Sequence, residues 1–357
     1  MQFGILTLAD VTRDPVTGMT MSHAARIDEI RLIAKVAEEV GLDVFALGEH
    51  HDSHFVGSSP PTILAAIAAE TTKITVTTAA TLITNNDPVR IAEEYALLQH
   101  IAHGRADLMI GCGGSALMYP WQGDDFPVGL DIATENYYLL RRLWHEESVE
   151  WEGEYHTPLV SFTSTPRPLD GVPPFVWHQG HSIDIADQAG FYGDGFFANN
   201  MNSLRKDVAL VAHYRQAYEK YNHGPATGAP VSLGGQIFVG RTTQDAFAGL
   251  RPYCNANAMY SMNLEDAALH TSLAVGSPAQ VIEKILKMRE LYGDYQRQLF
   301  LVDPGGMPLW AVLEQLEILG GAVAPALKKE FDARRPALVP SDPPTHESRV
   351  RQPTPTQ

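Results

Sequence analysis

Two adjacent histidines follow a glutamate at the end of a short apolar segment. Residues 43–51, DVFALGEHH, have the length and composition of a buried strand that ends in Glu49, His50 and His51. A histidine titrates near neutral pH, so one of these could act as a base or hydrogen-bond donor beside a reacting group. Neighbouring strand residues point to opposite faces, so the three side chains cannot alone form a tight metal site. The alternative is a pair of loop histidines bonded to nearby backbone.

Two further strand ends carry residues that could contact a flat or anionic ligand. Ala79 and Ala80 end a run rich in β-branched residues and leave a small, smooth surface for a ring. Gly111, Cys112 and Gly113 end the next predicted strand, and glycines let backbone amides approach an anion. The alternatives are core packing for the alanines, a tight turn for the glycines and an inert buried thiol for Cys112.

A fourth segment, Gly180-His181-Ser182, lies between a predicted strand and a predicted helix. Ser182 is a good N-cap residue, which is the simpler interpretation. The N-terminus of the same helix could instead receive a phosphate, because its first N–H groups lack partners within the helix.

The elements that must position these residues alternate between short strands and longer helices. Eight strands are predicted, each followed by a helical segment, and this pattern favours a (β/α)₈ barrel, an α/β TIM barrel with insertions. The predicted strands begin near residues 3, 43, 73, 106, 174, 194, 231 and 297. A doubly wound sheet is the competing fold, but no Gly-rich turn follows the first strand. In a TIM barrel the active site lies where the strands end, and all four segments lie there.

Composition excludes several classes of protein. The 357 residues include 26 basic and 42 acidic side chains, a net charge of −16, which argues against nucleic-acid binding and against an anionic membrane surface. Two cysteines provide no disulfide framework, and the start lacks the features of a signal peptide, so we expect a cytoplasmic protein. Residues 1–330 are predicted as one domain. Residues 331–357 are Pro-rich and aperiodic and are predicted as a disordered tail, with a docking strap as the alternative.

The chain resembles the flavin-dependent luciferase-like monooxygenases, whose best-known member is the bacterial luciferase alpha subunit. Four separated segments carry the resemblance, in the family's order and spacing: GLDVFALGEHH, TVTTAATLITNNDPVRIAEEYALLQHIAHGR, AGFYGDGFF and VGSPAQVIEKI. Together they cover the chain between about residues 3 and 330.

The resemblance implies a reduced-FMN-dependent monooxygenase that oxidises a small organic substrate with O₂. Reduced FMN is expected at the mouth of the barrel, where O₂ adds to C4a of the flavin ring. By similarity, Ala79 and Ala80 lie beneath the isoalloxazine and are joined by a non-proline cis peptide. His50 matches the catalytic histidine, and Glu49 and His51 shape the same wall.

The resemblance also assigns the phosphate end of the cofactor. Gly180, His181 and Ser182 match the loop that contacts the flavin phosphate, and Cys112 and Gly113 lie beside the cofactor. Many relatives have arginine at the position of Cys112, and the arginine that luciferase has in the next helix is absent here too. Ser182 and the helix that it starts are therefore expected to hold the phosphate.

Partners and alternatives follow from the same family. The family implies a separate NAD(P)H:flavin reductase and a homodimer or homotetramer, with no metal. One alternative is a dehydrogenase or reductase of the same fold that uses the deazaflavin F420. A second is a non-catalytic flavin-binding barrel or partner subunit, which the titratable His50 at the mouth argues against. Phe55, Trp121, Trp177 and Met201 are expected to line an apolar substrate pocket.

Overall fold

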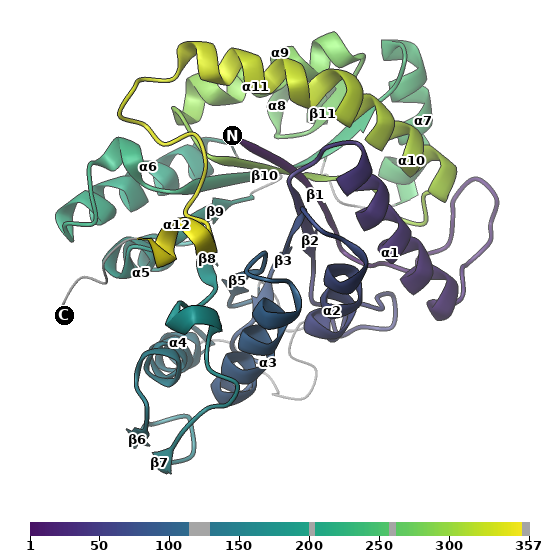
Figure 1. Cartoon of the computed structure of the whole chain (residues 1–357). Coiled ribbons are helices and arrows are strands. Elements are labelled where there is room, and N and C mark those ends of the chain that lie inside the picture. The colour runs from purple at the N-terminus through teal and green to yellow at the C-terminus, as the bar shows by residue number, and fades with distance from the viewer. Residues whose placement is uncertain (114–128, 200–203, 257–261, 352–357) are drawn as a thin grey trace.

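The chain forms a parallel β-barrel wrapped by helices (Figure 1), and the described residues contribute eight strands to it. The computed structural model describes residues 1–113, 129–199, 204–256 and 262–351. The barrel strands are β1 (Gln2–Thr7), β2 (Val44–Leu47), β3 (Thr75–Thr78), β5 (Asp107–Gly111), β8 (Phe175–Gln179), β9 (Gly195–Ala198), β10 (Val231–Val239) and β12 (Arg297–Leu301). The helices that follow them are α1 (His23–Glu39), α2 (Pro60–Glu70), α3 (Pro88–Ile101), α4 (Gly129–His145), α5 (Ile183–Tyr192), α6 (Leu204–Lys220), α7 (Thr243–Ala256), α8 (Leu264–His270), α9 (Pro278–Tyr292) and α10 (Leu309–Ile318).

All barrel strands run parallel, in the order β3-β2-β1-β12-β10-β9-β8-β5. The ring closes between β3 and β5, where Val76 forms an isolated parallel bridge with Ala106. A short strand, β4 (Thr81–Leu82), continues β3 and pairs with the end of β5. The predicted TIM barrel is therefore confirmed. The predicted third strand, residues 73–83, is divided into β3 and β4 at Ala79-Ala80.

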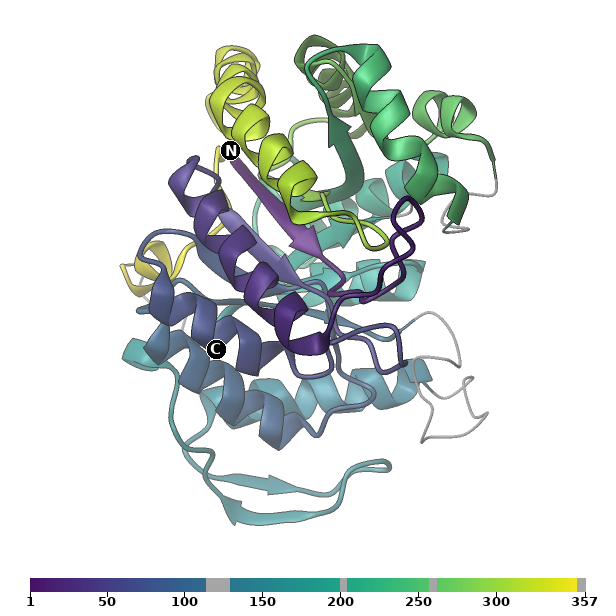
Figure 2. The ribbon, with the colours of Figure 1, turned by 90° about the vertical axis from the view of Figure 1, so that its right-hand side faces the viewer.

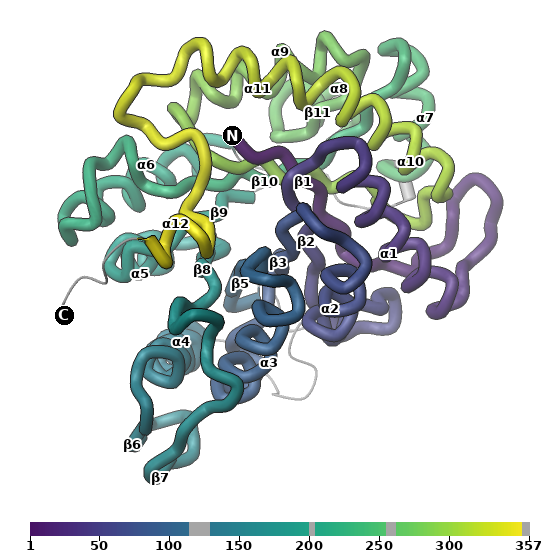
Figure 3. The backbone as a smooth tube through the Cα atoms, in the orientation of Figure 1, coloured from purple at the N-terminus to yellow at the C-terminus, as the bar shows by residue number. Residues whose placement is uncertain are grey.

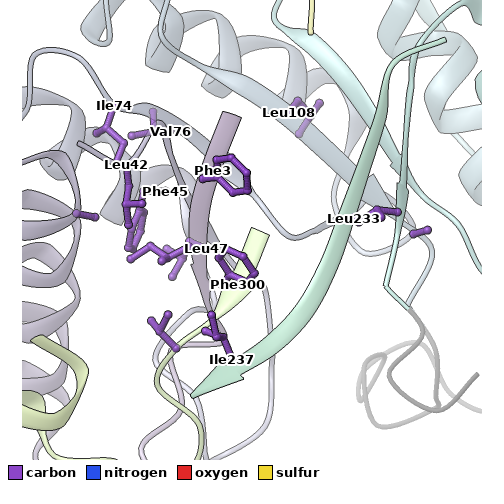
Figure 4. Close-up of a cluster of buried hydrophobic side chains, with 14 of the residues drawn as sticks. Phe3, Leu42, Phe45, Leu47, Ile74, Val76, Leu108, Leu233, Ile237 and Phe300 are labelled. Atoms are coloured by element: carbon purple, nitrogen blue, oxygen red, sulfur yellow. The ribbon is translucent and has the colours of Figure 1, made fainter. Parts of the chain in front are cut away.

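Side chains alternate between the inside of the barrel and the layer beneath the helices, as strand geometry requires. Leu6, Val44, Met109, Phe197 and Leu299 belong to the inner cluster. The outer cluster is larger, and Figure 4 shows part of it, with Phe3, Phe45, Val76 and Phe300 among its members. Both faces of the strands are therefore buried, which explains their near-continuous apolar character.

A polar group closes the end of the barrel where the strands begin. Arg297 is 1% exposed; its Nη2 lies 2.7 Å from Asp107 Oδ2, and its guanidinium carbon lies 4.6 Å from the centre of the Trp177 ring. Trp177 Nε1 donates to the same Asp107 oxygen at 3.3 Å. The expectation that Trp177 lines the substrate pocket is therefore wrong, because its ring fills the opposite end of the barrel. Trp121 and Met201 lie outside the described residues.

The connections contain elements that the sequence pattern did not resolve. The insertion after α4 forms an antiparallel hairpin, β6 (Val149–Trp151) and β7 (Leu159–Phe162), which projects from the barrel in Figures 1 and 2. A further strand, β11 (Ala274–Gly276), pairs with β10. Helix α10 continues past Ile318 through a π-helical turn, residues 319–323, into α11 (Ala324–Arg334). A Cβ on Gly320 would lie 2.3 Å from the Val40 carbonyl oxygen, so this glycine permits close helix packing and does not end the helix.

The C-terminal segment after α11, residues 335–351, packs against the chain's own barrel, and we call it the strap. The predicted disorder is wrong for residues 331–351: the chain runs from α11 to a short helix, α12 (His346–Val350), beside β8 (Figure 3). Asp342 Oδ1 pairs with the N-terminal amine at 2.7 Å, and Arg349 Nη1 donates to the Pro173 carbonyl at 2.6 Å. Specific polar contacts thus order a segment whose Pro-rich composition indicated disorder. Residues 352–357 lie outside the described part.

None of the helices in the described ranges combines the length and the apolar character needed to cross a bilayer.

Candidate active site

A cavity of about 210 Å³ opens where the barrel strands end. We call it the mouth cavity, and its walls come from the ends of β1, β2, β4, β5, β8 and β9 and from the start of α5. Its lining residues are Leu6, Leu8, Glu49, His50, Ala79, Ala80, Leu82, Gly111, Cys112, Gly113, Gln179, His181, Ile185 and Asn199. The structure thus brings together eight of the residues predicted from the sequence: Glu49, His50, Ala79, Ala80, Gly111, Cys112, Gly113 and His181.

His50 presents a neutral imidazole to this cavity. Its ring stacks on Phe55 with centroids 4.2 Å apart, and its Nδ1 is buried without a hydrogen-bond partner among the described residues. Burial lowers the pKa of His50, although Asp52 and Glu49 act in the opposite direction. A Cβ on Gly48 would lie 3.2 Å from His50 Cε1, so the glycine gives the ring room beside the strand end. A neutral imidazole with an unused nitrogen can accept or donate a proton.

Ala79 and Ala80 form one wall of the cavity and are joined by a non-proline cis peptide, as the resemblance implied. Side chains fix the chain on both sides of them. Thr78 Oγ1 donates to the Met109 carbonyl at 2.8 Å and accepts the Met109 N–H at 3.2 Å. These two side-chain bonds join β3 to β5 at a point where the two strands form no backbone hydrogen bonds. They therefore fix the position of Ala79 and Ala80, which we call the alanine wall.

Glu49 fixes the other side of this wall. Its side chain is 2% exposed, and Oε2 accepts the Leu82 N–H at 3.0 Å. Its Oε1 accepts from Asn86 Nδ2 and lies 2.8 Å from His51 Nε2. Glu49 therefore connects the strand that carries His50 to the segment after Ala80. His51 contacts Glu49 and is not among the residues that line the cavity, so the two histidines have different positions.

We expect Glu49→Gln to weaken cofactor binding about tenfold, because an amide cannot accept all of these bonds and each charge-assisted bond is worth roughly 1.5–3 kcal/mol. Equilibrium titration with reduced flavin measures the change. Glu94→Gln is the matched control, because Glu94 is a partly exposed residue of α3 that pairs with Arg90. Equal affinities for the two variants would show that Glu49 does not position the wall.

Cys112 and Gly113 lie at the end of β5. Burial raises the pKa of the Cys112 thiol to about 11, so the thiol stays protonated at neutral pH and is a small apolar group here. A Cβ on the neighbouring Gly111 would lie 3.2 Å from Ala80 Cβ and 3.3 Å from Gln179 Oε1. Larger side chains at this strand end would fill the cavity, which explains the run of small residues.

In the segment before α5, Gly180 and Ser182 stabilise the local structure, while His181 lines the mouth cavity. Ser182 Oγ accepts the Ile185 N–H at 3.3 Å and is the N-cap of α5, so its hydroxyl is already used by the helix. Gly180 donates its N–H to Phe197 O at 3.1 Å, and a Cβ there would meet the Phe196 ring at 2.0 Å. His181 lines the cavity, and its pKa is lowered by burial and by the positive charge of Lys206.

Three features therefore suit an anion at this edge: the start of α5, the His181 ring and the cationic Lys206 near it. Lys206 was not singled out from the sequence, because it lies at the start of α6, far from the motif in the chain. Asp184 in the first turn of α5 opposes an anion there.

Two polar residues of the cavity were also missed. Gln179 and Asn199 line it from the end of β8 and from the residue after β9, and Asn199 Oδ1 is buried without a partner in the described ranges. The sequence could have indicated both residues, because each is a polar residue at the end of a largely apolar strand. No three His, Cys, Asp or Glu side chains among the described residues converge as metal ligands.

Comparison with known proteins assigns the family. The family model described as luciferase-like monooxygenase matches residues 1–295. The chain belongs to the luciferase-like monooxygenase family. An F420-dependent glucose-6-phosphate dehydrogenase of Kineococcus radiotolerans is 34% identical over 172 residues, which are 46% of this chain and 50% of that protein. An N-acetyl-S-alkylcysteine monooxygenase of Bacillus subtilis is 25% identical over 236 residues, 64% of each chain. The chain thus matches half to two thirds of the length of these relatives.

A solved structure shares the fold of this luciferase-like chain. The oxygenating constituent of 3,6-diketocamphane monooxygenase from Pseudomonas putida, a type II Baeyer-Villiger monooxygenase in complex with FMN, has a TM-score of 0.75 at 19% identity. The comparison covers 91% of this chain and 98% of that one. The proteins that this chain resembles are thus named as monooxygenases and as an F420-dependent dehydrogenase, and one of them was solved in complex with FMN.

Proposed function

We propose that this protein is a two-component monooxygenase that uses reduced FMN and O₂ to oxidise a small organic substrate. The observation that carries the proposal is the neutral His50 ring, with an unused buried nitrogen, in the same cavity as the alanine wall. When bound, reduced FMN supplies two electrons to O₂; one oxygen atom enters the substrate and the other leaves as water.

The residues of the mouth cavity fit a flavin. The alanine wall offers a flat apolar surface, and Leu6, Leu8 and Leu82 add apolar contacts. Gln179 and Asn199 supply polar groups, and the start of α5 with His181 would hold the phosphate. In this arrangement His50 would hold or move a proton beside the reacting atoms, and Glu49 would keep the alanine wall in place. A separate NAD(P)H:flavin reductase and a homo-oligomer are parts of the same proposal.

One consequence concerns pH. A reaction that needs neutral His50 is present above the pKa of that residue and is lost as the pH falls through it. Burial lowers this pKa below its ordinary value of 6.5, so we expect the acidic limb of kcat/KM to lie below pH 6.5. A pH profile of the reconstituted enzyme measures it. An acidic limb above pH 7 would assign the required group elsewhere.

The second candidate is an F420-dependent oxidoreductase, favoured by the 34% identity to the F420-dependent dehydrogenase. O₂ uptake separates the two functions. Protein supplied with FMN, NADH and a flavin reductase is expected to show substrate-dependent O₂ consumption and incorporation of ¹⁸O from labelled gas. Oxidation of a substrate under anaerobic conditions with F420, and no label from ¹⁸O₂, would support the second function and overturn the first.

A further inference from the structure

A second cavity lies at the opposite end of the barrel from the mouth cavity. We call it the basal cavity, and its volume is about 250 Å³. Its walls come from α4, from the start of β8 and the turn before β9, and from the strap, and it shares none of its lining residues with the mouth cavity. Figure 2 shows α12 on the side of the molecule where β1 begins. The residues used below are Arg141, His145, Tyr192, Asp194 and Arg349, all of which line it.

Cationic groups outnumber carboxylates in this cavity. Arg141 and Arg349 both line it, and Asp194 is the one carboxylate among the described lining residues. Asp194 is already occupied, because Oδ2 lies 2.9 Å from His178 Nε2 and also accepts from Tyr137. Its other oxygen lies 3.4 Å from Arg141 Nη1, a long contact for an ion pair.

Arg349 lacks an anionic partner within the described ranges. Its Nη1 donates a hydrogen bond to the Pro173 carbonyl at 2.6 Å, and its guanidinium carbon lies 5.7 Å from the centre of the Phe175 ring. Burial lowers the pKa of His145, and the charges of Arg141 and Arg349 lower it further, so both guanidinium groups act on the same small volume. Among the described residues, Asp194 is the one carboxylate that lines the cavity beside these two partly buried guanidinium groups, so a bound anion would balance the remaining positive charge.

We propose that the basal cavity binds a phosphate group between the guanidinium groups of Arg141 and Arg349. Guanidinium donors form paired hydrogen bonds with phosphate oxygens, and each of these arginines has donors that no described residue uses. Phosphate bound there would connect α4 to α12 and so stabilise the strap against the barrel. Tyr192 and Phe175 also line the cavity, so the phosphate group could belong to an aromatic ester as well as to the free ion.

Titration calorimetry with inorganic phosphate and with phenyl phosphate tests the proposal on the full-length protein. We expect the wild-type protein to bind at least one of the two, and Arg349→Gln to bind it at least about tenfold more weakly. The matched control is Arg351→Gln, because Arg351 lies in the same segment but is exposed and pairs with Glu347. Weaker binding by Arg349→Gln together with unchanged binding by this control assigns the phosphate to the basal cavity, because Arg349 does not line the mouth cavity.

Arg349→Lys covers the case in which Arg349→Gln detaches the strap. Lysine keeps the positive charge, so binding between that of the wild type and that of Arg349→Gln supports the proposal. Phosphate should also slow tryptic cleavage within residues 335–351 in the wild type but not in Arg349→Gln. Tighter binding of phenyl phosphate would indicate an aromatic ester as the ligand, and tighter binding of inorganic phosphate the free ion. Absence of binding at about 10 mM of either compound, or equal binding by Arg349→Gln and the wild type, would overturn the proposal.

Discussion

Replacing His50 by alanine is expected to lower turnover about 10²- to 10⁴-fold while the barrel remains folded. The loss follows if the neutral imidazole transfers or holds a proton beside the reacting atoms in the mouth cavity. The fold should survive, because the substitution removes the stacking of the ring on Phe55 but no hydrogen bond of Nδ1, which bonds to no described residue. Lost stacking is worth roughly 0.5–1.5 kcal/mol, too little to unfold a chain of this size.

Steady-state kinetics with reduced flavin and unfolding in urea measure the two effects separately. His54→Ala is the matched control, because His54 lies in the same loop with a side chain that is 67% exposed and pairs with Asp52. This control should keep normal turnover. If His50→Ala also kept it, His50 would be a packing residue and the catalytic role would be wrong.

The second large effect concerns stability. Arg26→Met is expected to lower the free energy of unfolding by about 3–5 kcal/mol, because it leaves buried carboxylates without their cation. Arg26 is 5% exposed; its Nη2 lies 2.5 Å from Asp303 Oδ2, and its Nε donates to the Asp10 carbonyl at 2.9 Å. The cluster joins α1 to the loops that follow β1 and β12, and thereby holds one side of the barrel mouth.

The pH dependence of this variant has a predictable sign. Burial and the Asp303 charge raise the pKa of Asp10 from 3.8 to about 6. Folded Asp10 therefore binds its proton more tightly than unfolded Asp10. The resulting contribution to the free energy of unfolding is complete below about pH 4 and is lost as the pH rises through 6. Without Arg26 the ionised carboxylates repel each other, so the deficit of Arg26→Met should be larger at about pH 8 than at about pH 5.

Urea unfolding at both pH values measures this deficit. Arg31→Met is the control on the same helix, since Arg31 pairs with the surface residues Asp28 and Glu70 and should contribute at most about 1 kcal/mol. The double variant Arg26→Met/Asp303→Asn should recover part of the loss. A deficit as small as that of Arg31→Met, or one that does not change with pH, would contradict the role given to the cluster.

The barrel was predictable from the sequence because its signal is local and repeated. Each strand is an apolar run of few residues, and each is followed by a helical period, so the alternation alone predicted eight strands. The strand ends also predicted which residues meet, since parallel strands place their carboxyl ends at one side. Glu49 and His50 follow β2, Ala80 follows β3, and all three line one cavity for this reason.

Contacts between distant segments were not predictable, because ion pairs and side-chain bonds leave no local pattern. Arg26 and Asp303 are 277 residues apart, and neither neighbourhood indicates the other. Alternation along β8 predicts that Trp177 points into the barrel but not toward which end, and the deciding contacts with Asp107 and Arg297 come from other strands. The strap was hidden for the same reason: its prolines indicated disorder, while its order depends on partners such as the N-terminal amine.

The proposed function requires reduced FMN to bind in the mouth cavity against Ala79 and Ala80. Anaerobic equilibrium titration with reduced FMN, on the wild-type protein and on Ala80→Leu, tests it most directly. We expect saturable binding by the wild type and at least about tenfold weaker binding by Ala80→Leu, because the larger side chain would occupy the space of the ring. Binding of reduced F420 with no binding of reduced FMN, or equal affinity of both proteins for FMN, would contradict it.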